Sequence, residues 1–210
     1  MTKFVRLLLF FNVAVYGLQQ LARDNLYTHF ALWPLGRHYL SGSGFVGFEP
    51  WQLITSAFLH GSLPHIALNM YALYAFGGMV ERVMGERRFA WLYFASVFTG
   101  SLVQLLVVTM ALDQGVAPTV GASGGVFGVL LAFAVLFPHS RVYIIPVPFP
   151  LKAWVMVTGY ALIELASGVL GTTQGVAHFA HLGGMLGAII VLVATGFRKS
   201  TQPPGDIRGP

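Results

Sequence analysis

Apolar residues are arranged along this chain in six long runs separated by short polar segments. Each run is close to the roughly 20 residues that an α-helix needs to cross a bilayer, or somewhat shorter. The pattern therefore predicts an all-α polytopic membrane protein with six transmembrane helices. The predicted spans are residues 5–21, 63–80, 89–112, 123–137, 151–170 and 176–197.

Two segments lie outside these spans. Residues 23–50 form a long first loop that contains Trp33, Phe45 and Phe48. Aromatic residues concentrate where membrane meets water, so we expect this loop to lie in the interface. Residues 198–210 are rich in proline, glycine and charge, which is typical of a disordered tail. We therefore expect one membrane domain over residues 1–197 and a disordered cytosolic tail over residues 198–210.

The fourth span is short because Pro138 ends it. Residues 123–137 would extend about 22 Å as a helix, whereas the hydrocarbon core is roughly 30 Å thick. If the Pro138 end lies at the cytosolic face, Ser123 lies well below the outer surface. Residues 113–122 must then descend into the membrane, where non-helical backbone occurs only inside protein or beside a water-filled cavity. A hydroxyl at that place is a candidate reaction site.

Composition agrees with the membrane assignment. Of the 210 residues, 56% are hydrophobic and 9% are charged, whereas a soluble domain carries about a quarter charged residues. The formal charge of +5 comes from residues in short loops, so we attribute it to membrane topology and expect no nucleic-acid partner. The chain has no cysteine, which excludes internal disulfides and thiolate metal sites.

The loop charges predict an orientation. With a cytosolic N-terminus, ten basic residues lie inside and two lie outside, in agreement with the positive-inside rule. We expect both termini to be cytosolic and the candidate site to face the outer side. The ten inner residues are Lys3, Arg6, Arg82, Arg87, Arg88, Arg141, Lys152, Arg198, Lys199 and Arg208, and the two outer ones are Arg23 and Arg37.

Polar side chains from three distant segments are predicted to meet in the outer half of the membrane. Ser123 follows a glycine-dense turn at the start of the fourth span. The second span places His65 and Asn69 one turn apart on the same face. The last span carries His178 and His181 in its first turns. Ionisable residues inside a membrane usually mark function, although we interpret His178 as a hydrogen-bonded packing residue.

These residue types suit hydrolysis. An imidazole can take a proton from a serine hydroxyl, and neighbouring donors can stabilise a tetrahedral oxyanion. Glu164 is the only acidic residue predicted to lie within the membrane. We interpret it as a buried hydrogen-bonding residue or, alternatively, as a gate residue. The sequence therefore favours a Ser/His dyad over a triad with a carboxylate.

Two other chemistries fit less well. Residues 121–125 match the G-x-S-x-G elbow, but that motif requires a strand-to-helix turn in an α/β sheet. The histidines of the second and last spans could approach a metal, but no H-E-x-x-H helix or nearby carboxylate pattern supports such a site. We expect neither a metal nor a cofactor.

At this point the chain resembles the rhomboid family of intramembrane serine proteases, on motifs that together cover residues 49–188. The motifs are Gly121-Ala122-Ser123-Gly124 for the nucleophile, His60…His65…Asn69 in the second helix, Ala180-His181-x-x-Gly184 in the last helix, and Gly77-x-x-x-Glu81-x-x-x-Gly85 at the cytosolic end of the second helix.

The resemblance implies a role for each matching residue. Ser123 would be the nucleophile and His181 the general base. His65 and Asn69, with the backbone N–H of Ser123, would form the oxyanion hole. Phe127 would pack against the ring of His181.

The resemblance also implies that His60 supports the upper wall of the site. The fifth helix and the loop of residues 171–175 would act as a lateral gate for substrate helices. Two positions depart from the family. Gln52 stands where arginine is frequent, which would change the anchoring of the first loop. Ala188 replaces a frequent glycine, and Gly183 and Gly187 offer another small pair against the fourth helix.

We therefore expect a minimal six-helix protease that cleaves transmembrane or membrane-proximal segments of proteins in the lipid bilayer. Two alternatives remain: a catalytically inactive relative acting as an adaptor, and a small transporter. The adaptor predicts loss of the serine or the histidine, and the transporter predicts paired broken helices. From the compact chain we expect a prokaryotic inner (plasma) membrane.

Overall fold

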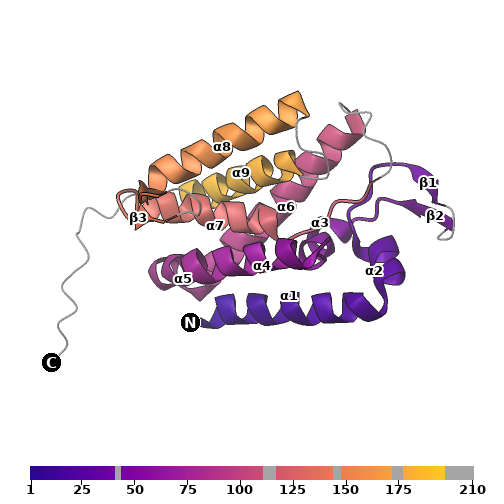
Figure 1. Ribbon diagram of the computed structural model, residues 1–210, viewed down its shortest axis with the longest axis horizontal. Coiled ribbons are helices and arrows are strands. Elements are labelled where there is room, and N and C mark those ends of the chain that lie inside the picture. The colour runs from indigo at the N-terminus through magenta and orange to yellow at the C-terminus, as the bar shows by residue number, and fades with distance from the viewer. Residues whose placement is uncertain (41–43, 111–116, 144–147, 172–176, 197–210) are drawn as a thin grey trace.

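The computed structural model describes residues 1–40, 44–110, 117–143, 148–171 and 177–196, apart from the side chains of Arg23 and Leu40. Within these ranges the chain is mostly helical (Figure 1). The helices are α1 (Lys3–Leu21), α2 (Arg23–Phe30), α3 (Gln52–Thr55), the 3₁₀-helix η1 (Ser56–Phe58), α4 (Leu63–Ala72), the π-helix η2 (Leu73–Gly77), α5 (Gly78–Met84), α6 (Glu86–Met110), α7 (Ser123–Leu136), α8 (Ala153–Leu170) and α9 (His178–Ala194). The strands form two antiparallel hairpins, β1 (Arg37–Leu40) with β2 (Gly44–Gly47), and β3 (Arg141–Val142) with β4 (Leu151–Lys152).

Each predicted span coincides with a helix or a helical run in the described ranges. The second span is one continuous run through α4, η2 and α5. Three helices, α1, α6 and α8, are long and apolar enough to cross a membrane, and α7 and α9 are shorter apolar helices. Large apolar side chains such as Phe10, Trp91 and Ile163 face outward. A surface of this kind suits contact with lipid rather than water.

Capping residues in the sequence explain where several of these helices begin and end. The Ser62 hydroxyl accepts a hydrogen bond from the backbone N–H of His65, and Pro64 lies in the first turn, so α4 begins there. Helices α5 and α8 are followed by Gly85 and Gly171, which both have positive φ angles that glycine adopts without strain.

Helices α6, α7 and α9 are packed closely together. Gly184 of α9 lies so near the Gly124 carbonyl of α7 that a methyl group at residue 184 would overlap it. The expectation that Gly183 and Gly187 contact the fourth helix is wrong. Both face the α6 backbone between residues 95 and 100, because residues four apart lie on one side of a helix and this side of α9 packs against α6.

Helix α1 is tethered to α5 by a buried carboxylate. The two oxygens of Glu81 accept hydrogen bonds from the backbone N–H groups of Phe4 (3.0 Å) and Val5 (2.9 Å). The first N–H groups of a helix have no partner within the helix, and a negative charge is favoured there. Glu81 therefore joins the first helix to the rest of the bundle.

The predicted first loop contains α2 and the β1–β2 hairpin. Gln52 is fully buried beneath it. Its amide oxygen accepts a hydrogen bond from the backbone N–H of Trp33 (3.1 Å), and its amide nitrogen donates to the carbonyl of Gly47 (3.2 Å). Gln52 therefore anchors the first loop through its side-chain amide, at the position where the resemblance led us to expect arginine.

Candidate active site

The residues just before Ser123 are hydrogen-bonded to the first loop and to η1. Leu32 and Thr119 exchange two backbone hydrogen bonds of 3.0 and 2.9 Å, and the N–H of Gly121 donates to a carbonyl of η1. The backbone at Gly121 has a φ of 130°, and a Cβ atom there would lie 2.7 Å from the ring of His65. Glycine alone satisfies both conditions. Ser123 is then the first residue of α7.

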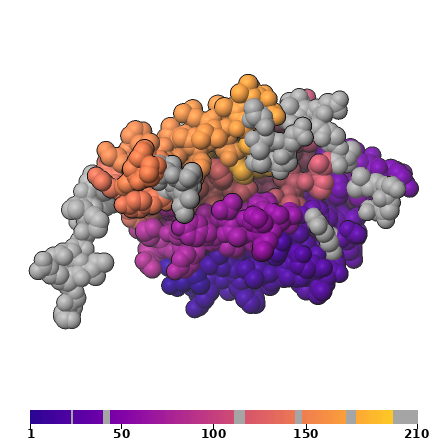
Figure 2. Space-filling model, in the orientation of Figure 1, coloured from indigo at the N-terminus to yellow at the C-terminus, as the bar shows by residue number. Residues whose placement is uncertain are grey.

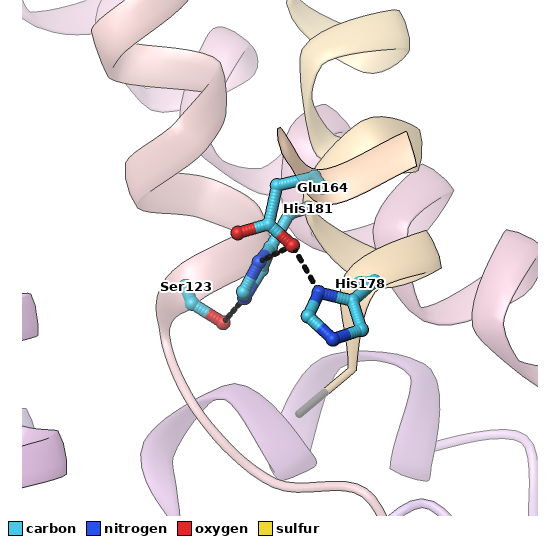
Figure 3. A network of polar contacts seen from close by, with 4 residues as sticks. All are labelled: Ser123, Glu164, His178 and His181. Atoms are coloured by element: carbon cyan, nitrogen blue, oxygen red, sulfur yellow. Dashed lines mark hydrogen bonds and ion pairs between the residues drawn. The ribbon is translucent and has the colours of Figure 1, made fainter. Parts of the chain in front are cut away.

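The structure brings Ser123 and His181 together from α7 and α9 (Figure 3). The Nε2 atom of His181 lies 2.8 Å from the Oγ atom of Ser123. The imidazole stacks on Phe127, with ring centroids 4.2 Å apart and an interplanar angle of 3°. The packing expected of Phe127 is therefore confirmed. Because Phe127 covers one face of the imidazole, it restricts rotation of the ring about its Cβ–Cγ bond.

Glu164 of α8 completes a polar cluster on the far side of the imidazole (Figure 3). Its Oε2 atom lies 2.6 Å from Nδ1 of His178 and 2.9 Å from Nδ1 of His181. The contact with His178 is a hydrogen bond, whereas the contact with His181 has the distance of an ion pair without hydrogen-bond alignment. Each of the three residues is 9% exposed.

Sequence reasoning did not assign Glu164 to the site. It favoured a dyad, and it interpreted Glu164 as a buried hydrogen-bonding residue and His178 as a hydrogen-bonded packing residue. The burial and hydrogen bonding of both residues are confirmed. The signal was present, because Glu164 is an acidic residue inside an apolar span and such residues usually mark function. The sequence of α8 does not indicate which neighbouring helix the Glu164 side chain faces. Its contact with α9 could therefore be found only from the three-dimensional structure.

His65 and Asn69 lie on α4 across from the serine. The His65 ring contacts Gly121, two residues before Ser123. Asn69 is buried, and its Nδ2 atom has no hydrogen-bond partner among the described residues. A buried amide donor without an acceptor costs free energy unless a ligand supplies one. Asn69 therefore offers a buried hydrogen-bond donor on α4.

His60 precedes α4 and contacts His65. It is fully buried, and its ring lies 5.1 Å from that of His65. Its backbone N–H donates to the side-chain oxygen of Gln19 (3.0 Å), and its carbonyl accepts from the Gln19 amide and the Tyr27 hydroxyl. Burial and the neighbouring His65 lower the pKa of His60 to about 4, so the ring stays neutral at physiological pH.

A small cavity opens beside the Ser123 hydroxyl. Several of its walls carry hydroxyl groups, and polar walls of this kind can hold water. Among the described residues no group of three or more histidine, aspartate or glutamate side chains could hold a metal ion. The cavity walls include Ser56, Ser101, Thr119, Gly121, Ser123 and Ala177.

Three further predicted features lie wholly or largely outside the described residues. They are the tail of residues 198–210, most of the loop of residues 171–175, and the first part of the segment of residues 113–122.

Comparison with known proteins gives one consistent family. Residues 47–197 match the Rhomboid domain. The mitochondrial Rhomboid protein 1 of Saccharomyces cerevisiae is 33% identical over 183 residues, which cover 87% of this chain and 50% of that protein. RHOMBOID-like protein 4 of Arabidopsis thaliana is 34% identical over 72% of this chain and 33% of its own length.

One bacterial relative is named as a protease. Rhomboid protease GluP of Bacillus subtilis is 29% identical over 155 residues, which cover 72% of this chain and 27% of GluP. The chain spans half or less of the length of these curated relatives. The match to the Rhomboid domain extends over most of the chain and includes the motifs identified in the sequence. The chain belongs to the rhomboid family.

Proposed function

We propose that this protein is an intramembrane serine endopeptidase that hydrolyses peptide bonds in or near transmembrane segments of other proteins. The observation that carries the proposal is the 2.8 Å contact between Nε2 of His181 and Oγ of Ser123. A serine within hydrogen-bond reach of an oriented imidazole is the arrangement that activates a weak hydroxyl nucleophile. The family and the name of GluP support the same activity.

In the proposed reaction, Oγ of Ser123 attacks the carbonyl carbon of the scissile bond while its proton passes to Nε2 of His181. The resulting oxyanion accepts hydrogen bonds from the backbone N–H of Ser123, the amide of Asn69 and the ring of His65. His181 then protonates the leaving amine, and the C–N bond breaks. Water, deprotonated by the same imidazole, hydrolyses the acyl-enzyme and regenerates the serine.

We also propose the arrangement in the membrane. Six helical spans cross the bilayer, the first loop lies in the outer interface, both termini are cytosolic and the site faces the outer side. The positions of the six helical segments and the ten-to-two distribution of loop cations support this arrangement. The membrane in question would be a prokaryotic plasma membrane, and the substrates would be proteins that it holds.

The experiment is a cleavage assay in proteoliposomes with a transmembrane substrate, together with labelling by a fluorophosphonate probe. We expect Ser123→Ala and His181→Ala to lower kcat/KM by at least about 10³-fold, since each removes part of one catalytic unit. Ser101→Ala is the matched control. This serine lines the same cavity, but among the described residues it has no hydrogen bond to a histidine ring.

Full cleavage by Ser123→Ala would show that the nucleophile is wrongly assigned. A folded wild-type protein that neither cleaves several substrates nor reacts with the probe would instead favour the adaptor.

A further inference from the structure

We propose that Glu164 is a positioning residue of the catalytic unit, whose carboxylate holds His181 in the orientation and tautomer that accept the Ser123 proton. This inference rests on the proposed function and adds a third group to the dyad. It follows from the placement of one carboxylate oxygen 2.9 Å from Nδ1 of His181, on the opposite side of the ring from the serine.

The tautomer of His181 decides whether the pair can react. Nε2 can accept the serine proton only when the neutral ring carries its hydrogen on Nδ1. A carboxylate beside Nδ1 favours that tautomer and stabilises the imidazolium that forms during attack. The contact is not aligned as a hydrogen bond, but such contacts are often poorly aligned without substrate and tighten when it binds.

His178 holds the carboxylate in place. Its Nδ1 atom donates a 2.6 Å hydrogen bond to the same oxygen of Glu164. His178 and His181 are three residues apart on α9 and so lie on one face of that helix. A single oxygen of Glu164 therefore lies between two imidazoles. The hydrogen bond from His178 holds this oxygen beside His181.

The location of Glu164 gives the contact a second consequence. Ser123 and His181 lie on α7 and α9, whereas Glu164 lies on α8, which forms an edge of the bundle (Figures 1 and 2). Outward-facing Ile163 and Leu165 flank the glutamate on that helix. The three groups are together only while α8 packs against α9, so any outward displacement of α8 would separate the carboxylate from His181.

The kinetics of Glu164→Gln test the assignment. Loss of the carboxylate removes the negative charge that stabilises the imidazolium formed during attack. We expect kcat to fall by at least about tenfold while KM stays within about twofold of the wild type, because the carboxylate acts in the transition state and not on substrate binding.

Two variants control for a purely structural effect. Glu164→Asp keeps the charge and should restore part of the lost kcat. Glu81→Gln alters the other buried glutamate, which accepts hydrogen bonds from backbone N–H groups of α1. We expect Glu81→Gln to lower the unfolding temperature while leaving kcat of the folded protein unchanged.

A measurement without substrate separates this inference from the proposed function. In ¹⁵N-histidine NMR spectra, assigned by comparison with His181→Ala, we expect the neutral His181 ring to carry its hydrogen on Nδ1. Glu164→Gln should shift the population towards the Nε2–H tautomer. An unchanged tautomer together with an unchanged kcat would overturn the role of Glu164, even if Ser123→Ala and His181→Ala abolish cleavage. An inactive wild type with the expected tautomer shift would overturn only the proteolytic function.

Discussion

At the scale of single residues, the turn before α7 is the most constrained part of the site. Gly121 has a φ of 130°, and its missing side chain leaves room for the His65 ring. We expect Gly121→Ala to abolish cleavage and to slow fluorophosphonate labelling by more than about tenfold, because the backbone is strained and the ring is displaced. Labelling rates in detergent would test this.

Gly17→Ala is the control for that variant. Gly17 lies in α1 with nothing within 4 Å of its missing Cβ atom. Alanine is a better helix former than glycine by about 1 kcal/mol, so Gly17→Ala should label like the wild type. Normal labelling of Gly121→Ala would show that the turn tolerates a side chain.

A second prediction at this scale concerns pH and His60. Its pKa is about 4 in the folded protein and 6.5 in an unfolded chain. Between these values the unfolded state binds more protons, so stability falls as pH decreases from about 6.5 towards 4. We expect the unfolding temperature in detergent to drop more between pH 7 and pH 4.5 for the wild type than for His60→Gln. Equal drops would show that the buried ring does not control acid stability.

At the scale of elements, the contact between α8 and α9 decides whether Glu164 reaches His181. Gly168 lies one turn after Glu164, and a Cβ atom there would lie 3.1 Å from the Phe179 ring and 3.2 Å from the His178 Cβ atom. We expect Gly168→Leu to push α8 outward and to reduce cleavage by about tenfold or more, since it moves the Glu164 carboxylate away from His181. Proteoliposome cleavage rates would measure the loss.

Gly159→Leu is the matched control on the same helix, because nothing lies within 4 Å of its missing Cβ atom. Its cleavage rate should stay within about twofold of the wild type, as is usual for a substitution that creates no clash. Equal rates for both leucine variants would mean that the spacing between α8 and α9 does not affect the reaction.

At the scale of the whole molecule, the proposed orientation can be tested with single cysteines, because the native chain has none. Tyr39 is 70% exposed in the first-loop hairpin, and Arg87 is exposed near the start of α6. We expect an impermeant thiol reagent to label Tyr39→Cys in intact cells and to label Arg87→Cys only after lysis. The opposite result would reverse the topology inferred from loop charge.

The sequence by itself determined the features that depend on local pattern. Apolar runs located the six helical segments, because a helix buried in lipid must be apolar along its length. Glycine, proline and serine marked the ends of α4, α5 and α7. The motifs around Ser123, His65 and His181 indicated the family, which the comparison confirmed.

Only the tertiary structure decided which side chains face one another. Glu164 lies beside His181, Gln52 joins Trp33 to Gly47 at the end of β2, and Gly183 faces α6 rather than α7. Each of these contacts depends on how a helix is turned about its own axis, because that decides which neighbouring segment a side chain faces. In a span that is apolar on all sides, hydrophobic periodicity carries little information about that rotation. Close packing of distant segments determines it, and so decides that a carboxylate joins the serine and the histidine.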